Sequence, residues 1–236
     1  MDKSTSAFDL FVNTFISNKS IILTALWQHI YISLASLVIS LCISIPLGIY
    51  LTRKKNLAGI AIGITGVFQT IPSIALFGFM LPFVGIGVKP TIIALVLYSL
   101  LPIVRNVYTG ILEVNQAVVD AGRGMGMTNW QILWNIELPL ALPVVMAGVR
   151  TAAVSTIGVT TIAAFIGAGG LGEIVFRGVA LMRTELIIAG GVPAALLAVI
   201  TELLLKRLEA KVTPNKHSLS KQTSRLKKKV ERTVKA

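Results

Sequence analysis

The sequence is short of the residues that let a folded chain face water or carry out chemistry. Only 14% of its 236 residues are charged, whereas an average soluble domain has about 25%. Reactive groups are also scarce, because Cys42 is the single cysteine and His29 and His217 are the two histidines. A single cysteine excludes a disulfide framework. The cysteine and the two histidines are also too widely spaced in the sequence to indicate a metal cluster or a nucleophile–base pair. We therefore predict no catalytic residues, no metal site and no enzymatic activity.

Two further absences narrow the class of protein. The sequence has no G-x-x-x-x-G-K-[ST] motif, so it lacks the backbone cradle and the lysine that hold ATP in P-loop proteins. A basic surface for nucleic acid is also missing, although the net charge is +12. Eleven Lys or Arg residues against two Glu lie from Lys206 onward, so the tail carries +9 of that charge. We expect no cofactor bound by this chain and no nucleic-acid partner.

Apolar residues, by contrast, are abundant: 54% of the chain is hydrophobic and the mean hydropathy is +0.80. A helix needs roughly 20 apolar residues to cross the hydrocarbon core of a bilayer. Five stretches meet this requirement, at about 27–51, 57–81, 90–112, 140–166 and 185–205. We therefore predict an all-α polytopic membrane protein with about five transmembrane helices, in which prolines inside the spans produce kinks.

The chain divides into three parts on this pattern. Residues 1–26 form an N-terminal amphipathic or interfacial segment, in which 8–23 lies at the membrane surface or, alternatively, forms a sixth span. Residues 27–205 form the transmembrane domain, which contains the five spans. Residues 206–236 form a basic, disordered tail that lies near anionic lipid or, alternatively, senses ionic strength.

The positive-inside rule gives an orientation. Arg53, Lys54 and Lys55 follow the first span, and the basic tail follows the fifth. Because four spans separate the two, both lie in the cytoplasm and the N-terminus lies outside. The multi-pass chain therefore has a cytoplasmic C-terminus, and residues 113–139 form a cytoplasmic loop.

This loop is polar and rich in glycine, unlike the rest of the chain. Its sequence DAGRGMGMTNWQILWNIELP, residues 120–139, predicts a helix, a turn at GRGMG, and a second helix over 129–136 with Thr128 as its N-cap. Such a helix–turn–helix has one apolar face to bury. It buries that face either on its own transmembrane domain or in a groove on a cytoplasmic partner.

The spacing in this loop resembles the EAA coupling loop of type I ABC importer permeases. The family pattern is EAA, three residues, G, nine residues, I, one residue and LP. The matching residues here are Asp120, Ala121, Gly122, Gly126, Ile136, Leu138 and Pro139, with Asp in place of Glu and Gly in place of the second Ala. The resemblance implies that these residues and Trp130 form coupling helices that dock on a separate ATPase.

Other runs resemble the permeases for compatible solutes, namely FQTIPS, LPIVRN, MGMT and FIGAGGLGE at positions 68–73, 101–106, 125–128 and 165–173. The resemblance covers about residues 25–210. It implies the permease subunit of an ATP-driven importer in a bacterial plasma membrane, which moves glycine betaine, carnitine, choline or a similar quaternary amine inward as an osmoprotectant. A permease for an amino acid such as methionine is one alternative. An ion-coupled carrier is another, disfavoured because the ten acids lie mostly outside the spans.

The resemblance also implies an assembly. It consists of a second permease subunit, identical or paralogous, two cytoplasmic ATPase subunits that bind ATP and Mg, and an extracytoplasmic substrate-binding protein. This chain would form one half of the pore.

Polar residues inside the spans are candidates for the translocation path. They are Gln69, Thr70, Pro72, Ser73, Arg150, Ser155, Thr156 and Thr160. Hydroxyl groups in a span alternatively bond to their own helix or to a neighbouring helix. Arg150 is either a path-facing charge or the partner of Glu113 or a helix C-terminus.

Glycines follow the fourth span, on the outer side. Gly167, Gly169, Gly170 and Gly172 form either an ordinary flexible connection or a re-entrant turn that closes the outer mouth. Trp27 and His29 are expected to anchor the outer edge of the first span, where amphipathic rings are common.

Overall fold

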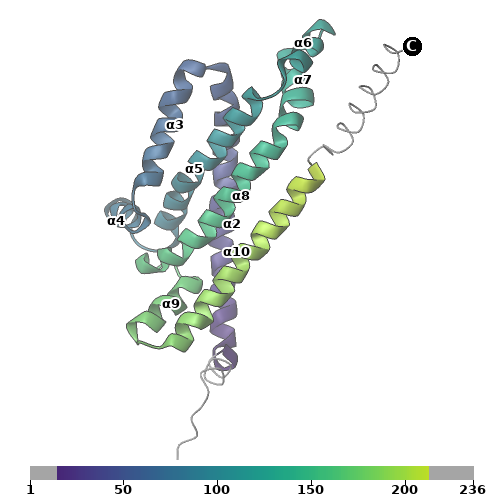
Figure 1. Cartoon of the computed structure of the whole chain (residues 1–236). Helices are drawn as coiled ribbons and strands as arrows, with labels where there is room; N and C mark the ends of the chain where they lie inside the picture. The colour runs from purple at the N-terminus through teal and green to yellow at the C-terminus, as the bar shows by residue number, and fades with distance from the viewer. Residues whose placement is uncertain (1–14, 213–236) are drawn as a thin grey trace, which may run out of the picture.

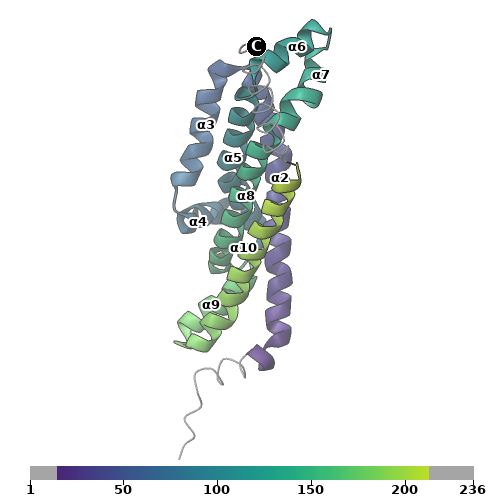
Figure 2. The same ribbon diagram turned by 45° about the vertical axis from the view of Figure 1, so that its right-hand side comes forward.

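The computed structural model describes residues 15–212, and every regular element among them is a helix. Four helical runs are long and apolar enough to cross a membrane: α2 (Lys19–Arg53), α5 (Val88–Leu112), the run Asn129–Ile166 and α10 (Thr184–Val212). The bent pair α3 (Lys55–Thr70) and α4 (Ser73–Val84) provides a fifth crossing if it is counted as one span. The helices lie side by side in an elongated bundle (Figures 1 and 2). The predicted all-α fold with about five spans is confirmed.

The predicted terminal segments fall largely outside the described residues. Residues 1–14 of the interfacial segment and residues 213–236 of the tail are not described. Residues 19–26 are the first turns of α2, and residues 206–212 continue α10. Two of the transmembrane helices are therefore longer than the apolar stretches that predicted them.

The second predicted span is broken near its middle. α3 ends at Thr70, α4 begins at Ser73, and the two helices are bent by 98°. Pro72 explains the break, because its ring disfavours a helical conformation at the preceding residue and it has no N–H to donate. Ile71 is accordingly extended, with ψ of 128°, and its carbonyl accepts a hydrogen bond from the Tyr98 hydroxyl of α5. The kink expected here is thus a sharp turn, whereas helices continue through Pro46, Pro102 and Pro193.

The centre of the bundle is formed by α2, α5 and α8 (Leu138–Ala163). Glycines let these helices approach closely. A β-carbon added at Gly48 of α2 would lie 2.6 Å from the Val107 side chain, and one at Gly148 of α8 would lie 2.6 Å from the Asn106 side chain. Small residues at helix contacts are the usual packing in membranes, where close backbone approach replaces the hydrophobic driving force.

The two ends of the bundle differ. α6 (Gln116–Gly124) and α7 (Asn129–Ile132) lie at one end, near the C-terminal end of α2, and we call this the loop end (Figure 1). α9 (Leu171–Ala180) and the first turns of α2 lie at the opposite end, the α9 end (Figures 1 and 2). The predicted coupling residues and gate residues therefore lie at opposite ends of the molecule.

Candidate functional site

At the loop end, two short helices are joined by a tight turn. α6 begins after Asn115, whose Oδ1 accepts the Ala117 N–H at 3.0 Å. α7 begins at Asn129, and Thr128 and Gln131 form a capping box. In this box the Gln131 N–H donates to Thr128 Oγ1 at 3.3 Å, and the Thr128 N–H donates to Gln131 Oε1 at 2.8 Å. The predicted helix–turn–helix and its Thr128 cap are confirmed.

Gly126 makes the turn between the helices possible. Its φ is +82°, a backbone conformation that residues other than glycine rarely adopt. Its N–H donates to the Arg123 carbonyl at 2.9 Å. After α7 the chain continues as a π-helical turn, η1 (Leu133–Glu137), which leads directly into α8. The predicted helix 129–136 is therefore α-helical only over Asn129–Ile132.

The inner face of this segment is buried against the transmembrane domain. Val119, Ile132 and Leu133 are buried in one core cluster with residues of α5 and α8. Gly122 lies where α6 meets the helix that follows it, and a β-carbon there would lie 2.7 Å from Ile136 Cδ1. This face therefore follows the first of the two alternatives, burial on the chain's own domain.

The opposite face of the segment is apolar and open. Met125, Trp130 and Trp134 are 75%, 67% and 53% exposed, and the two indole rings pack edge to face with centroids 5.7 Å apart. Asp120 is also exposed and forms an ion pair with Arg123 at 3.0 Å. Of the other residues in the pattern, Ala121 and Pro139 are exposed and Ile136 and Leu138 are half-buried. Large apolar side chains gathered on an exposed surface are typical of a partner site, so this face suits the second alternative.

Glu137, the last residue of η1, is a buried acid that the sequence analysis did not single out. It is 5% exposed and accepts hydrogen bonds from both terminal nitrogens of Arg53, one of them at 3.1 Å. Such two-pronged arginine–carboxylate pairs combine charge with fixed geometry. The available signal was an acid placed directly before an apolar span, together with a basic cluster at the end of an earlier span.

The polar residues predicted in the second span gather at the break between α3 and α4. Gln69 Nε2 donates to a carbonyl of α5 at 3.4 Å, and Thr70 Oγ1 donates to a carbonyl of its own helix at 2.8 Å. Gln69, Thr70 and Pro72 are exposed, and Ser73 is half-buried. The break therefore presents polar groups on the surface of this single chain.

The hydroxyl candidates on α8 separate into two groups. Thr156 and Thr160 are buried and bond to Ser99 of α5 at 2.8 Å and Ser33 of α2 at 3.0 Å. Each also donates to the carbonyl four residues earlier, at 2.7 Å. These contacts match the alternative in which span hydroxyls join helices. Ser155, by contrast, is exposed.

The charge of Arg150 on α8 is matched by α10. Its Nη1 lies 3.6 Å from Glu202 Oε1, and its Nε lies 3.7 Å from Glu209 Oε2. The two carboxylates are two helical turns apart, so the guanidinium spans both. This arrangement fits the structural ion pair among the alternatives, with acids of α10 in place of Glu113.

The glycines predicted as an outer gate form the turn between α8 and α9. Gly167, Gly169 and Gly170 have φ values of 76°, 78° and 78°, which favour glycine. The Gly170 N–H donates to Gln28 Oε1 of α2 at 3.1 Å. A β-carbon at Gly172 would lie 1.9 Å from a carbonyl oxygen of α8. The turn is therefore a compact piece of backbone packed against two helices rather than an open connection.

Beneath this turn lies His29. It is fully buried, and its Nε2 is 3.1 Å from the Ile157 carbonyl oxygen of α8. Its predicted role as an interfacial anchor is therefore wrong, because burial in helix packing keeps it from the membrane surface. Trp27, at 72% exposed, does present its ring outward.

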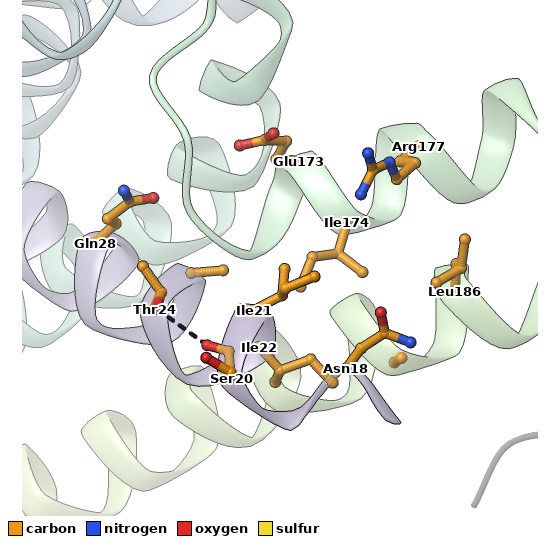
Figure 3. A pocket seen from close by; sticks show the side chains of 12 residues that line it. Asn18, Ser20, Ile21, Ile22, Thr24, Gln28, Glu173, Ile174, Arg177 and Leu186 are labelled. Atoms are coloured by element: carbon orange, nitrogen blue, oxygen red, sulfur yellow. Dashed lines mark hydrogen bonds between the residues drawn. The ribbon is translucent and has the colours of Figure 1, made fainter. Parts of the chain in front are cut away.

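A cavity of about 270 Å³ opens at the α9 end, between the first turns of α2, α9 and α10 (Figure 3). Ile22, Ile174 and Leu186 supply apolar lining, and Glu173 and Arg177 of α9 supply charges (Figure 3). Its lining includes none of the predicted path or gate residues. Among residues 15–212, no group of three or more His, Cys, Asp or Glu side chains is placed to hold a metal ion.

Known proteins are similar to this chain in sequence, and solved structures are similar to it in fold. Residues 44–214 match the family described as the binding-protein-dependent transport system inner membrane component. The chain is similar to the carnitine transport permease protein OpuCB of Listeria monocytogenes, with 44% identity over 87% of this chain and 94% of the relative. It is also similar to the glycine betaine/carnitine/choline transport system permease protein OpuCB of Bacillus subtilis, with 47% identity over 79% and 86% of the two chains.

Among solved structures, a chain of the inward-facing MetNI methionine ABC transporter has the same fold. The TM-score is 0.72 at 25% identity, over 83% of this chain and 98% of that chain.

Proposed function

The chain belongs to the family of binding-protein-dependent transport system inner membrane components and is the permease subunit of an ABC importer, and we propose that it carries an osmoprotectant. The proposed solutes are quaternary amines such as glycine betaine, carnitine and choline. Permeases of this kind lack their own ATPase, so a partner subunit hydrolyses the ATP. The membrane protein is multi-pass.

The observation that carries the substrate proposal is sequence identity over most of the chain. The two relatives described above are 44% and 47% identical, and their names specify carnitine, glycine betaine and choline. The methionine transporter chain is 25% identical. The amino-acid alternative therefore rests on a more distant likeness than the osmoprotectant does.

The assembly we propose contains a second permease subunit, identical or paralogous, two ATPase subunits and a substrate-binding protein. ATP and Mg bind on the ATPases. The loop end faces the cytoplasm with the C-terminus, and the N-terminus lies outside. Arg53, Lys54 and Lys55 at the loop end support this orientation through the positive-inside rule.

The coupling surface, defined as the exposed face of Met125, Trp130 and Trp134, docks on the ATPase in this proposal. Large exposed aromatic side chains are suited to anchoring an interface. The surface rests on a tightly packed inner face, held by Gly122 against Ile136 and turned at Gly126. Motion of the ATPase would reach the spans through Leu138 and Pro139 at the start of α8.

The proposed path runs along the surface that carries Ser155 of α8 and the α3–α4 break with Gln69, Thr70, Pro72 and Ser73. Thr156, Thr160 and Arg150 join α8 to α5, α2 and α10 respectively, so in this proposal they hold α8 in place and do not line the path. The turn of Gly167, Gly169, Gly170 and Gly172 is the proposed outer gate. A zwitterion or quaternary amine suits weakly polar walls, since strong charge would retain it.

Reconstitution tests the proposal. The complex with its ATPase, in vesicles with the binding protein, is assayed for uptake of labelled glycine betaine, carnitine, choline and methionine. We expect uptake of a quaternary amine that requires ATP and persists when the proton gradient is collapsed. Uptake of methionine alone would replace the substrate, and uptake driven by a proton gradient without ATP would favour the ion-coupled carrier.

A further inference from the structure

Arg53 and Glu137 join parts of the chain that are 84 residues apart in sequence. Glu137 ends η1 at the entrance to α8, and Arg53 is the last residue of α2. The side chain of Glu137 is 7% exposed and that of Arg53 is 45% exposed, so the base lies over a buried acid. A carboxylate buried to this degree is strongly unfavourable without a partner.

The Arg53–Glu137 contact lies at the end of the π-helical turn η1. η1 separates α7 from α8. π-helical turns are rare in proteins, and those that occur often lie at functional sites. Trp130 lies in α7 and Trp134 lies near the start of η1, so both tryptophans precede Glu137 at the end of the turn. Along the chain, a displacement applied to the tryptophans reaches α8 through η1.

Other ion pairs among the described residues do not make this connection. Asp120 and Arg123 pair within α6, and Arg183 and Glu185 pair at the α9 end. Arg150 links α8 to α10. The Arg53–Glu137 pair is thus the ionic contact in residues 15–212 that holds the coupling loop to α2.

We propose that Arg53 and Glu137 are positioning residues that make α2 and α8 follow the coupling surface when the ATPase closes. The proposal rests on the proposed function of that surface. Bending at η1 would carry the Glu137 carboxylate away from the end of α2 and leave it buried and unpaired. The pair resists that bending because the guanidinium fixes both distance and orientation. Closure is therefore passed to two central helices instead of being absorbed in the turn.

The test uses the full complex in vesicles with the binding protein and measures solute taken up per ATP hydrolysed. The variants are Arg53→Gln, Glu137→Gln and the double variant. The control is Lys54→Gln, which removes a charge from the next residue without touching Glu137. We expect each single variant to lower the ratio clearly below wild type, because the loop can then bend at η1 without moving α2. Binding of the ATPase stays unchanged, and Lys54→Gln keeps the wild-type ratio.

The double variant separates positioning from structural support. If the pair only neutralises a buried charge, removing both charges restores the wild-type ratio, and the proposal is overturned. If the pair transmits motion, the double variant stays uncoupled although its thermal stability is recovered. Arg53→Lys keeps the charge but loses the two-pronged geometry, so an intermediate ratio is expected.

Failure of the two proposals is distinguishable. Wild-type complex that takes up solute with ATP, combined with wild-type ratios in every variant, overturns the positioning role alone. Wild-type complex that shows no ATP-dependent uptake overturns the proposed function and the positioning role with it.

Discussion

Gly122 of α6 lies in direct contact with Ile136 of η1, so close that a β-carbon on the glycine would be 2.7 Å from Ile136 Cδ1. This contact holds the first and last parts of the coupling loop together. The atom met is the tip of a flexible side chain, so a methyl group can be accommodated by a small rotation. A larger group has no such room, because Met127 and Ile132 also lie within 4 Å of the same point.

Gly122→Ala is therefore expected to keep uptake and thermal stability near wild type, whereas Gly122→Leu is expected to lower both. Overpacking a buried site typically costs about 1–3 kcal/mol. The matched control is Gly124→Leu, since a β-carbon at Gly124 meets nothing within 4 Å. Melting temperature of the purified permease and uptake in vesicles measure the effects. A Gly122→Leu protein as stable as the control would show that α6 does not pack on η1.

Substitutions at Gly126 test the backbone conformation of the turn, because they change no packing contact. Its φ is +82° and a β-carbon there would meet nothing within 4 Å. Gly126→Ala should destabilise the loop by about 1–2 kcal/mol, the usual penalty for a left-handed residue, and Gly126→Asn by less. Gly124→Ala should have the opposite sign, because Gly124 is the last helical residue of α6. Melting temperatures that do not differ between the two alanine variants would contradict the turn geometry.

The two exposed tryptophans test the coupling surface. We expect Trp130→Ala/Trp134→Ala to leave the fold intact, because both rings are largely exposed, and to weaken ATPase binding by at least about 2 kcal/mol, or roughly 30-fold in Kd. The control is Trp27→Ala, which removes an exposed tryptophan from the α9 end. Affinity is measured between detergent-solubilised permease and ATPase. Unchanged affinity in the double variant would move the docking site elsewhere.

Local chemistry predicted part of this molecule well. The apolar stretches gave the number of spans, and Thr128 with Gln131 gave the start of α7, because both signals depend on residues close together in sequence. A break at Pro72 is expected from the sequence and is present, but the sequence does not rank the prolines by how strongly each bends its helix. Pro102 sits inside a continuous helix while Pro72 separates two helices, although both prolines lie in apolar stretches of similar length.

Contacts between distant segments were beyond prediction from the sequence. Arg53 is a topology signal in the sequence, but its partner Glu137 lies 84 residues away. The position of His29 near the start of the first apolar stretch predicts that it lies at the membrane surface. The turn before α9 covers it instead. In both cases the deciding information is which helices meet.

Arg150 distinguishes a structural charge from a path-facing one. Because Glu202 and Glu209 lie 3.6 and 3.7 Å from its guanidinium, Arg150→Gln should lower the melting temperature and leave the KM for solute unchanged. The loss should be about 1 kcal/mol, since the groups are partly exposed. Neutralising Glu202 in the same protein should recover part of the loss. A raised KM with unchanged stability would instead place Arg150 on the path.

Three hydroxyl positions on α8, Ser155, Thr156 and Thr160, test where solute passes. Thr156 and Thr160 are buried and bonded to Ser99 and Ser33, whereas Ser155 is exposed. Thr156→Val and Thr160→Val keep the shape of the side chain and remove the hydroxyl, so we expect each to lose about 0.6 kcal/mol of stability, typical of hydrogen bonds between membrane helices. Their KM values should match wild type. Ser155→Val should change KM while the melting temperature stays constant, because no buried bond is lost. The opposite result, in which the threonine variants alter KM and Ser155→Val leaves it unchanged, would exclude a path along the exposed face of α8. Solute would then pass between α8 and the helices α2 and α5 that pack on it.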